Sequence, residues 1–302
     1  MRKFKENILK ILLYLSALIT VGILVFIIGF IFIKGYKLIS FDYLFGEYKP
    51  SGGGGIKPFI ISTLYTVGLS LLVATPIGVL AAVYLQEYAK QGKLVRVIRY
   101  STEALSGIPS IVYGLFGAAF FVAALKFGYS LIAGSLTLAI IILPVIIRTT
   151  EESLKVVPPS YREASLGLGA TRFQTLYKVI LPSAIPGILS GVILSMGRVI
   201  GESAALFLTA GTVYKIPTSI MSSGRTLTVH AFLETKEKGD IASAAAAGIV
   251  LIVMILVLNL LAKFISNKFN KANYKFLSII RVNSYYIWSN YLVKENHIDF
   301  EV

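Results

Sequence analysis

Two charged side chains, Arg198 and Glu202, lie in an otherwise apolar stretch, between Lys178 and Lys215, that carries no other charge. A charge at the centre of a bilayer costs about 2.5–3.5 kcal/mol on insertion scales, so an apolar segment needs a reason to keep one. A guanidinium presents a planar fork of N–H donors that matches the oxygen pairs of an oxyanion. The pair therefore predicts a polar contact for an anion inside a membrane-spanning helix.

The spacing of these residues allows two interpretations. Side chains four residues apart share one face of a helix, so Arg198 and Glu202 can form an ion pair. Gly197 and Gly201 have the same spacing and predict a surface for close contact between helices. The pair could simply pin two helices together, or it could line a polar cavity. Ionisable residues inside membranes generally mark functional sites, which favours the cavity.

A second chemically informative segment is the polar connection 148–182, in which Pro158 and Pro159 block an upstream helix. Ser160 and Glu163 have the spacing of a capping box and predict a short helix from about residue 161. Glycine tolerates left-handed backbone, so we expect this helix to end at Gly167 and Gly169.

A second helix follows this glycine pair. Thr171 and Gln174 form another capping-box pattern, and we expect the helix to run from there to Leu181 and Pro182, where the next membrane span begins. Two short helices joined at a glycine elbow form a compact projection. On sequence chemistry alone, an ordinary structured loop is favoured over a functional projection.

Long apolar segments must hold these residues in place. Hydrophobic residues make up 56% of the 302 residues and charged residues 15%, well below the roughly 25% charge that is typical of soluble domains. A span needs about 20 apolar residues. The pattern predicts an all-α membrane protein with six transmembrane helices, at about 11–33, 59–85, 105–125, 129–147, 183–210 and 241–262.

Basic residues between the spans predict the orientation. They are more frequent around the two termini and in the connections 86–104 and 148–182 than in the connections 34–58 and 211–240. Lysine and arginine accumulate on the cytoplasmic side of membrane proteins. We therefore expect a multi-pass membrane protein with both termini cytoplasmic. The apolar run near the N-terminus is too long for a cleaved signal peptide, so we expect it to be retained.

Several other chemistries are excluded or disfavoured. The sequence has no cysteine, and its two histidines, His230 and His297, lack neighbours at metal-ligand spacing, so we expect no metal site and no cofactor. Neither Gly52–Gly55 nor Gly92-Lys93 continues into a phosphate-binding loop, so any ATP hydrolysis must reside on another chain. The net charge of +14 lies at span edges and does not predict nucleic-acid binding.

The connection 148–182 resembles a known signature. Glu163-Ala164-Ser165, three residues, Gly169, nine residues, then Val179-Ile180-Leu181-Pro182 is similar to the EAA motif of ABC importer permeases, with Ser165 and Val179 as small departures. The resemblance implies a type I importer permease (MetI-like) fold and no enzymatic activity of its own. It also implies that the coupling loop 158–182, through Glu163, Ala164, Gly169, Leu181 and Pro182, docks on an ATPase subunit.

Three further blocks narrow the resemblance to the permeases of phosphate-specific (Pst) importers, the A subunit (PstA) more than the C subunit. These blocks are 54–64, 106–116 and 198–205. The implied function is ATP-driven import of inorganic phosphate across a lipid bilayer, with Arg198 and Glu202 on the substrate path. The implied partners are a PstC-like second permease, two PstB-like ATP-binding subunits and an extracytoplasmic PstS-like phosphate-binding protein.

The resemblance covers roughly residues 5–265, which suggests three regions. We expect an N-terminal helix and extracytoplasmic loop at 1–58, a permease core of five helices at 59–265, and an unassigned cytoplasmic tail at 266–302. Sulfate or molybdate remains an alternative substrate, because Arg198 suits any tetrahedral oxyanion. A stand-alone secondary transporter is a further alternative, but such proteins usually contain internal repeats, and none is evident. A non-transporting scaffold would have no need for buried charges.

Overall fold

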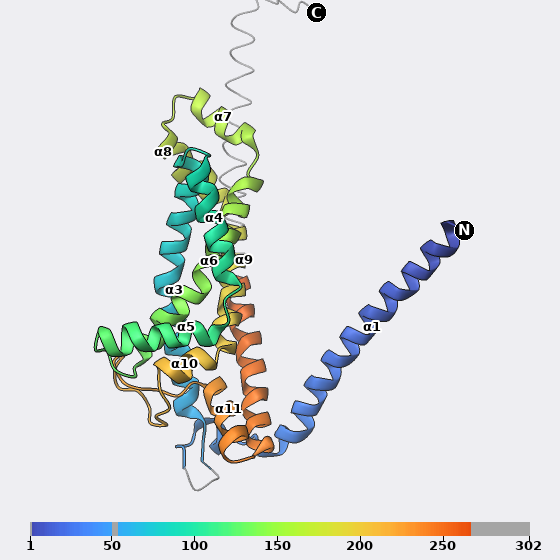
Figure 1. Ribbon diagram of the computed structural model, residues 1–302, viewed down its shortest axis with the longest axis vertical. Helices are drawn as coiled ribbons and strands as arrows, with labels where there is room; N and C mark the ends of the chain where they lie inside the picture. The colour runs from blue at the N-terminus through green and yellow to red at the C-terminus, as the bar shows by residue number, and fades with distance from the viewer. Residues whose placement is uncertain (1, 50–53, 267–302) are drawn as a thin grey trace, which may run out of the picture. The chain divides into compact units, whose positions relative to one another are not determined.

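The computed structural model describes residues 2–49 and 54–266, and within these ranges the chain is built from helices and connecting loops without any strand (Figure 1). The predicted all-α fold is confirmed. The tail predicted at 266–302 lies outside the described residues except for its first residue.

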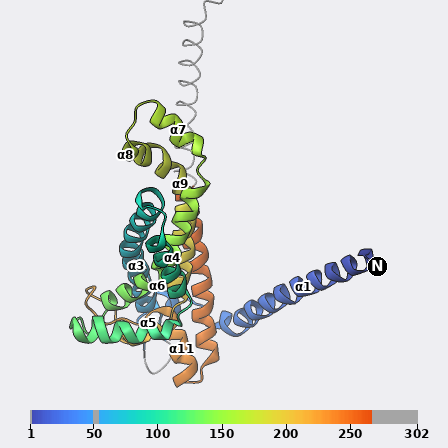
Figure 2. The same ribbon diagram turned by 45° about the horizontal axis from the view of Figure 1, so that its top comes forward.

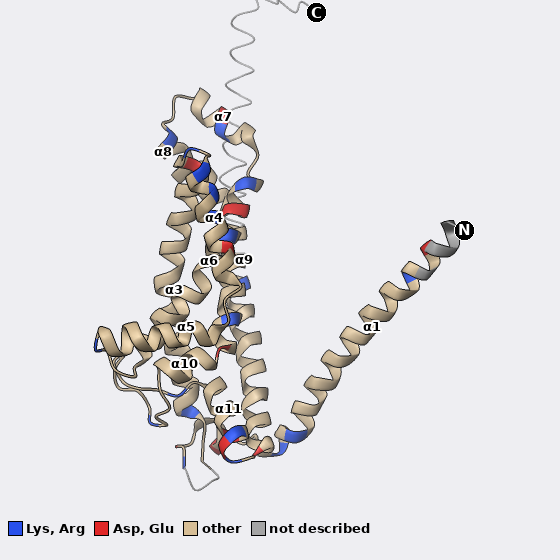
Figure 3. Cartoon of the chain, viewed as in Figure 1, with Lys and Arg blue, Asp and Glu red and all other residues tan. Residues whose placement is uncertain are grey.

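Among the described residues, five helices are long and apolar enough to cross a bilayer, and each overlaps one of the six predicted spans. Four of them include helices labelled in Figure 1, namely α1 (Arg2–Gly35), α3 (Lys57–Val83), α6 (Leu131–Val156) and α9 (Leu181–Gly201). The fifth, Ile241–Ser266, carries no label. With the short turns that extend them, the spans are Leu9–Leu38, Lys57–Tyr88, Leu131–Val156, Arg172–Gly201 and Ile241–Ser266. Figure 3 shows the long uncharged stretches of these helices, with most charges near their ends.

The predicted span 105–125 is wrong as a single straight helix. The chain forms α4 (Lys93–Ser106), breaks, and continues as α5 (Ser110–Gly117), which runs on through the π-helical turn η3 (Ala118–Ala124). The two parts are bent by 99° at the break, so they make a sixth crossing only if the bent pair counts as one span. The cause is Pro109, which disfavours helical backbone in the residue before it and begins the new helix with an extended ψ of 138°.

The predicted span 183–210 is also wrong at both ends. Its helix begins at Arg172, because α8 (Arg172–Thr175) continues without a break through the π-helical turn η4 (Leu176–Ile180) into α9. It ends at Gly201, and a separate short helix, α10 (Ala204–Thr209), follows. The apolar composition continues across the break, so hydropathy alone could not reveal it.

The remaining elements are short. They comprise η1 (Tyr36–Leu38), α2 (Phe41–Phe45), the π-helical turn η2 (Tyr84–Tyr88) that extends α3, α7 (Pro159–Gly167) and α11 (Leu227–Glu237). The helix Ile241–Ser266 completes the described chain.

The described chain forms two compact units, each assembled from separate stretches of sequence. The first comprises Met1–Val73, Gly107–Ile142 and Met196–Leu256. Within it α5 packs closely on α10, since a Cβ on Gly114 would lie 2.8 Å from the Cα atom of Ala205. Small and hydroxylated residues allow such close packing of membrane helices.

α1 belongs to this unit but buries almost nothing in it. None of the residues in its most apolar stretch is buried, and Leu13 and Phe26 are 69% and 72% exposed. A continuous apolar surface of this size is unsuited to water and suits the acyl chains of a bilayer. At its end Gly35 approaches the backbone of Ala245 and Ala246 so closely that a Cβ would not fit.

The second unit comprises Ala74–Ser106, Leu143–Ser195 and the described residues from Val257 onward. One apolar cluster joins the ends of α3, α6 and α9 with η4; its buried members are Val83, Leu154, Val157, Leu176, Ile180, Ala184 and Ile188. Van der Waals packing of such side chains stabilises the contact between membrane helices. This cluster is the base from which α7 and α8 project (Figures 1 and 2).

Candidate functional site

The coupling loop contains the two short helices that the sequence predicts, but the first begins earlier than expected. α7 starts at Pro159, with Pro158 at the N-cap and no side-chain cap. The predicted capping box of Ser160 and Glu163 is therefore wrong. Proline suits the first helical position, because its φ is already helical and its missing N–H would have no intrahelical partner there. Ser160 consequently lies inside the first turn.

The elbow and the second cap are confirmed. Gly169 has a φ of +82°, the left-handed backbone that side chains with a Cβ adopt at a cost. The hydroxyl of Thr171 accepts the Gln174 N–H at 3.2 Å, and the Gln174 side chain accepts the Thr171 N–H at 2.9 Å. These reciprocal bonds fix the direction in which α8 leaves the elbow.

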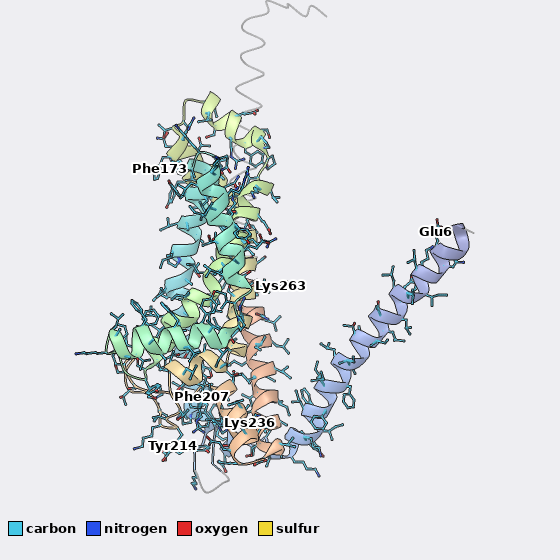
Figure 4. The ribbon with its side chains drawn as sticks, viewed as in Figure 1. Glu6, Phe173, Phe207, Tyr214, Lys236 and Lys263 are labelled. Atoms are coloured by element: carbon cyan, nitrogen blue, oxygen red, sulfur yellow. The ribbon has the colours of Figure 1, made fainter. Side chains whose placement is uncertain are left out.

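The projection presents apolar side chains to its surroundings. Leu168 is 70% exposed, Phe173 67% and Tyr177 65%, and the two aromatic rings are nearly parallel. Figure 4 shows Phe173 on the outer side of α8. Glu163 and Ala164 of the predicted coupling set are exposed on α7, which itself buries no residue. Exposed apolar side chains rimmed by polar ones are typical of protein docking surfaces.

The prediction that a membrane span begins at Leu181 and Pro182 is wrong. They do not mark the start of a helix, because α8, η4 and α9 form one continuous helix. At the junction the Leu181 N–H reaches the Leu176 carbonyl five residues back, in a widened turn. Leu181 packs against the apolar cluster at the base of the projection, and its part in coupling stays a prediction.

Arg198 and Glu202 are close in sequence but do not form the predicted ion pair. α9 ends at Gly201, so Glu202 lies in the break after the helix, where the four-residue helical spacing no longer applies. The Glu202 carboxylate instead accepts the Ala205 N–H at 3.3 Å and caps the first turn of α10. The predicted pairing is therefore wrong, although both residues stay at the same end of α9.

Arg198 is half-buried in the last turn of α9. Its charge is near enough to the Tyr113 hydroxyl of α5 to interact with it. Among the side chains that the structure describes, no carboxylate lies within ion-pair distance of the Arg198 guanidinium. A charge in a largely apolar span without a counter-charge can hold an anionic ligand.

Sequence reasoning missed a cluster around α11. The Glu234 Oε1 atom accepts hydrogen bonds from the Tyr48 hydroxyl at 3.1 Å and the Lys238 Nζ at 3.0 Å, and lies 3.5 Å from the His230 Nδ1. Burial, with the positive charges of Arg225 and Lys238, lowers the pKa of His230 to about 3, so its imidazole is neutral at neutral pH.

The signal for this cluster was partly visible. His230, Glu234 and Lys238 are spaced four residues apart, which places them on one helical face. Tyr48 could not be inferred, because its bond to Glu234 crosses 186 positions of sequence. The described residues contain no group of three or more metal-ligating side chains.

The all-helical fold and its long apolar helices fit an integral membrane protein, and comparison with known proteins identifies the class. A family model described as "Binding-protein-dependent transport system inner membrane component" matches residues 74–271, well over half of the chain. The chain belongs to this family of ABC importer permeases.

Individual proteins with similar sequences indicate which group within this family the chain resembles. It is 36% identical over 287 residues to "Probable ABC transporter permease protein YqgI" of Bacillus subtilis, covering 89% of this chain and 98% of that protein. It is 33% identical over 267 residues to "Phosphate transport system permease protein PstA" of Mycobacterium leprae, covering 86% and 88%. It is 39% identical over 211 residues to the protein of that name from Pasteurella multocida, covering 69% of this chain and 75% of that protein. Within the family the chain groups with the PstA-type permeases, as its sequence motifs indicated.

Solved structures confirm the predicted importer-permease fold. A chain of a bacterial alginate ABC transporter in complex with its periplasmic protein superposes with a TM-score of 0.63 at 17% identity, covering 87% of this chain and 96% of that one. A chain of the MetNI methionine ABC transporter superposes at 0.53 with 22% identity, covering 72% and 94%. Identities this low establish the shared fold and nothing about substrate.

Proposed function

We propose that the chain is the transmembrane permease subunit of an ATP-driven importer of inorganic phosphate. The observation that carries the substrate class is the Arg198 guanidinium, half-buried near the end of α9 with no carboxylate partner among the described side chains. A guanidinium binds phosphate oxygens in a bidentate manner. The phosphate transport systems named for its M. leprae and P. multocida relatives support phosphate as the anion.

Coupling to ATP is assigned to the exposed projection of α7 and α8. The sequence lacks a phosphate-binding loop, so the energy source must be a partner, and the apolar surface around Leu168, Phe173 and Tyr177 gives such a partner a place to dock. The EAA-like segment from Glu163 to Pro182 forms this projection. We place it, with both termini, on the cytoplasmic side of a prokaryotic cell membrane, because the neighbouring connections are rich in basic residues.

The proposed complex contains this chain, a PstC-like second permease, two copies of a PstB-like ATP-binding subunit and an extracytoplasmic PstS-like phosphate-binding protein. The chain itself catalyses no covalent step. Its task is to open the path to one side of the membrane at a time. The connections 34–58 and 211–240, which include α2 and α11, face the binding protein in this arrangement.

Energetics require such coupling. A phosphate carries about −1.5 to −2 charges near neutral pH by analogy with phosphoryl groups. Moving one charge against 100 mV costs about 2.3 kcal/mol, so entry into a negative-inside cell costs about 3.5–4.6 kcal/mol before any concentration gradient. A passive pore would therefore release phosphate, whereas an ATP-driven gate can accumulate it.

The test is uptake of radiolabelled phosphate by proteoliposomes that contain the complex, with the phosphate-binding protein outside and ATP inside. We expect uptake that requires both and that excess sulfate or molybdate does not inhibit. If sulfate or molybdate inhibits phosphate uptake, or is itself taken up in place of phosphate, the substrate is another tetrahedral oxyanion. Uptake without the ATPase subunit would refute the importer assignment and favour a secondary transporter.

A further inference from the structure

Arg162 is the main polar contact between α7 and the rest of its unit. Its guanidinium donates from Nη2 to the Glu87 carboxylate at 2.6 Å. It also donates to two carbonyls at the end of α6, those of Leu154 at 3.2 Å and Val157 at 3.3 Å. One side chain thus joins α7 to the ends of two long helices.

Glu87 belongs to η2, the π-helical turn that extends α3. Four residues earlier, Val83 lies in the apolar cluster with Leu154 and Val157. The end of α3 is therefore held to α6 by an apolar layer and to α7 by the ion pair. Only 26% of the Arg162 side chain and 16% of the Glu87 side chain is exposed, so water screens this pair less than a surface pair.

Few other contacts restrain α7. It buries no residue, and the chain leaves it through the left-handed Gly169. A hydrogen bond between the hydroxyls of Ser165 and Thr175, at 2.9 Å, connects it to α8. The hydrogen bonds and ion pairs found among the described residues include just one from α7 to the end of α3, the bond between Arg162 and Glu87.

We propose that the Arg162–Glu87 ion pair is the connection through which a movement of α7 displaces the end of α3. Both are positioning residues, and the proposal rests on the proposed docking of an ATPase subunit on α7. When the docked subunit moves α7, the charged bond at 2.6 Å carries η2 with it. Without the bond, α7 can follow the ATPase while α3 stays behind, so ATP is hydrolysed without transport.

The experiment separates coupling from assembly. Glu87→Gln removes the charge and keeps the shape, and Glu87→Lys reverses the charge, whereas Arg162 variants would also disturb the carbonyls of α6. In proteoliposomes holding the full complex, we expect ATP hydrolysis to continue while phosphate uptake per ATP falls roughly 2- to 30-fold, the span of changes measured along coupling networks. We expect Arg162→Glu combined with Glu87→Arg to recover part of that ratio.

The matched control is Glu152→Gln. Glu152 pairs with Arg148 at 3.1 Å on α6, but both side chains are at least 60% exposed. Its loss should leave uptake per ATP unchanged. A wild-type ratio for Glu87→Gln would overturn the proposal. So would uptake and hydrolysis falling together in proportion to abundance, because that pattern indicates a structural role.

A second readout does not depend on the substrate. The chain has no cysteine, so Tyr84→Cys places a single thiol on η2, where Tyr84 is 59% exposed. We expect its labelling by a maleimide to differ between ATP and ADP, and Glu87→Gln to abolish the difference. A difference that survives Glu87→Gln, or that is absent with Glu87 in place, overturns the connection. If the labelling depends on the nucleotide but the complex takes up no phosphate, phosphate is refuted as the substrate and the connection between Arg162 and Glu87 still stands.

Discussion

Arg198→Gln is the most direct test of the anion contact. The substitution keeps a polar side chain of similar length and removes the charge and the bidentate fork. A hydrogen bond to a charged group contributes about 1.5–3 kcal/mol, so the loss should slow phosphate uptake about 10- to 150-fold. Arg198→Lys keeps the charge without the fork and should also be impaired, though less.

The structure also predicts how much of the Arg198→Gln variant reaches the membrane. Arg198 has no carboxylate partner among the described side chains, so neutralising it leaves no buried charge uncompensated. It also removes a charge whose insertion costs about 2.5–3.5 kcal/mol at the bilayer centre. We therefore expect Arg198→Gln to reach the membrane at wild-type abundance. If Arg198 and Glu202 were a buried ion pair, loss of either partner would cost about 3–5 kcal/mol and reduce abundance.

Glu202 gives the complementary measurement. A glutamine at this position can still accept the Ala205 N–H, so Glu202→Gln should keep the cap of α10 and most of the uptake. The assay compares membrane abundance by immunoblot with uptake by whole cells for both single variants and the double variant. Arg148→Gln, on an exposed arginine of α6, is the matched control and should change neither quantity.

Two outcomes would refute this reasoning. Wild-type uptake by Arg198→Gln would show that the guanidinium does not contact the anion. Low abundance in both single variants, restored together with transport in the double variant, would show that the two side chains pin helices together.

Three further predictions concern other parts of the chain. Gly169→Val places a β-branched residue at a φ of +82° and should weaken co-purification of the ATPase subunit, whereas Gly167→Ala, where a Cβ meets open space, should not. Lowering the pH from 7 to 5 should reduce thermal stability in detergent by about 2 kcal/mol, because the pKa of His230 is about 3 when folded and about 6.5 when unfolded. The unfolded chain then binds a proton that the folded chain does not, stability is lost as pH falls from 6.5 towards 3, and His230→Phe should remove this loss. Truncation after residue 268 should leave phosphate uptake largely intact, and loss of uptake at normal abundance would contradict this.

Hydropathy identified most of the helices, because a bilayer imposes a minimum length of apolar sequence that loops rarely reach. It failed where the helix direction depends on backbone chemistry within an apolar run. Pro109 divides α4 from α5, and the break at Glu202 divides α9 from α10, without any change in composition. A proline between two apolar segments could have raised the first possibility, whereas nothing in the residues around Glu202 specified the second.

In the candidate site, too, features set by local sequence were predictable, whereas contacts between distant residues were not. Gly169 and the cap from Thr171 to Gln174 were predictable, since local spacing alone determines them. The bond between Arg162 and Glu87 joins residues 75 positions apart, so it depends on how the ends of α3, α6 and α7 pack. Charged residues beside a predicted loop gave no means of choosing this partner over the many others.

In the proposed function, the position of Arg198 before the break after α9 bears on release of the anion as well as on its binding. Arg198 lies in the last turn of α9, where the helix dipole is negative and stabilises a cation. That same dipole opposes an incoming anion, so the attraction of the guanidinium is partly offset. Conduction requires binding that is strong enough for entry and weak enough for exit. In the proposed function, the guanidinium of Arg198 attracts the anion, and the dipole at the C-terminus of α9 limits how tightly the anion is held.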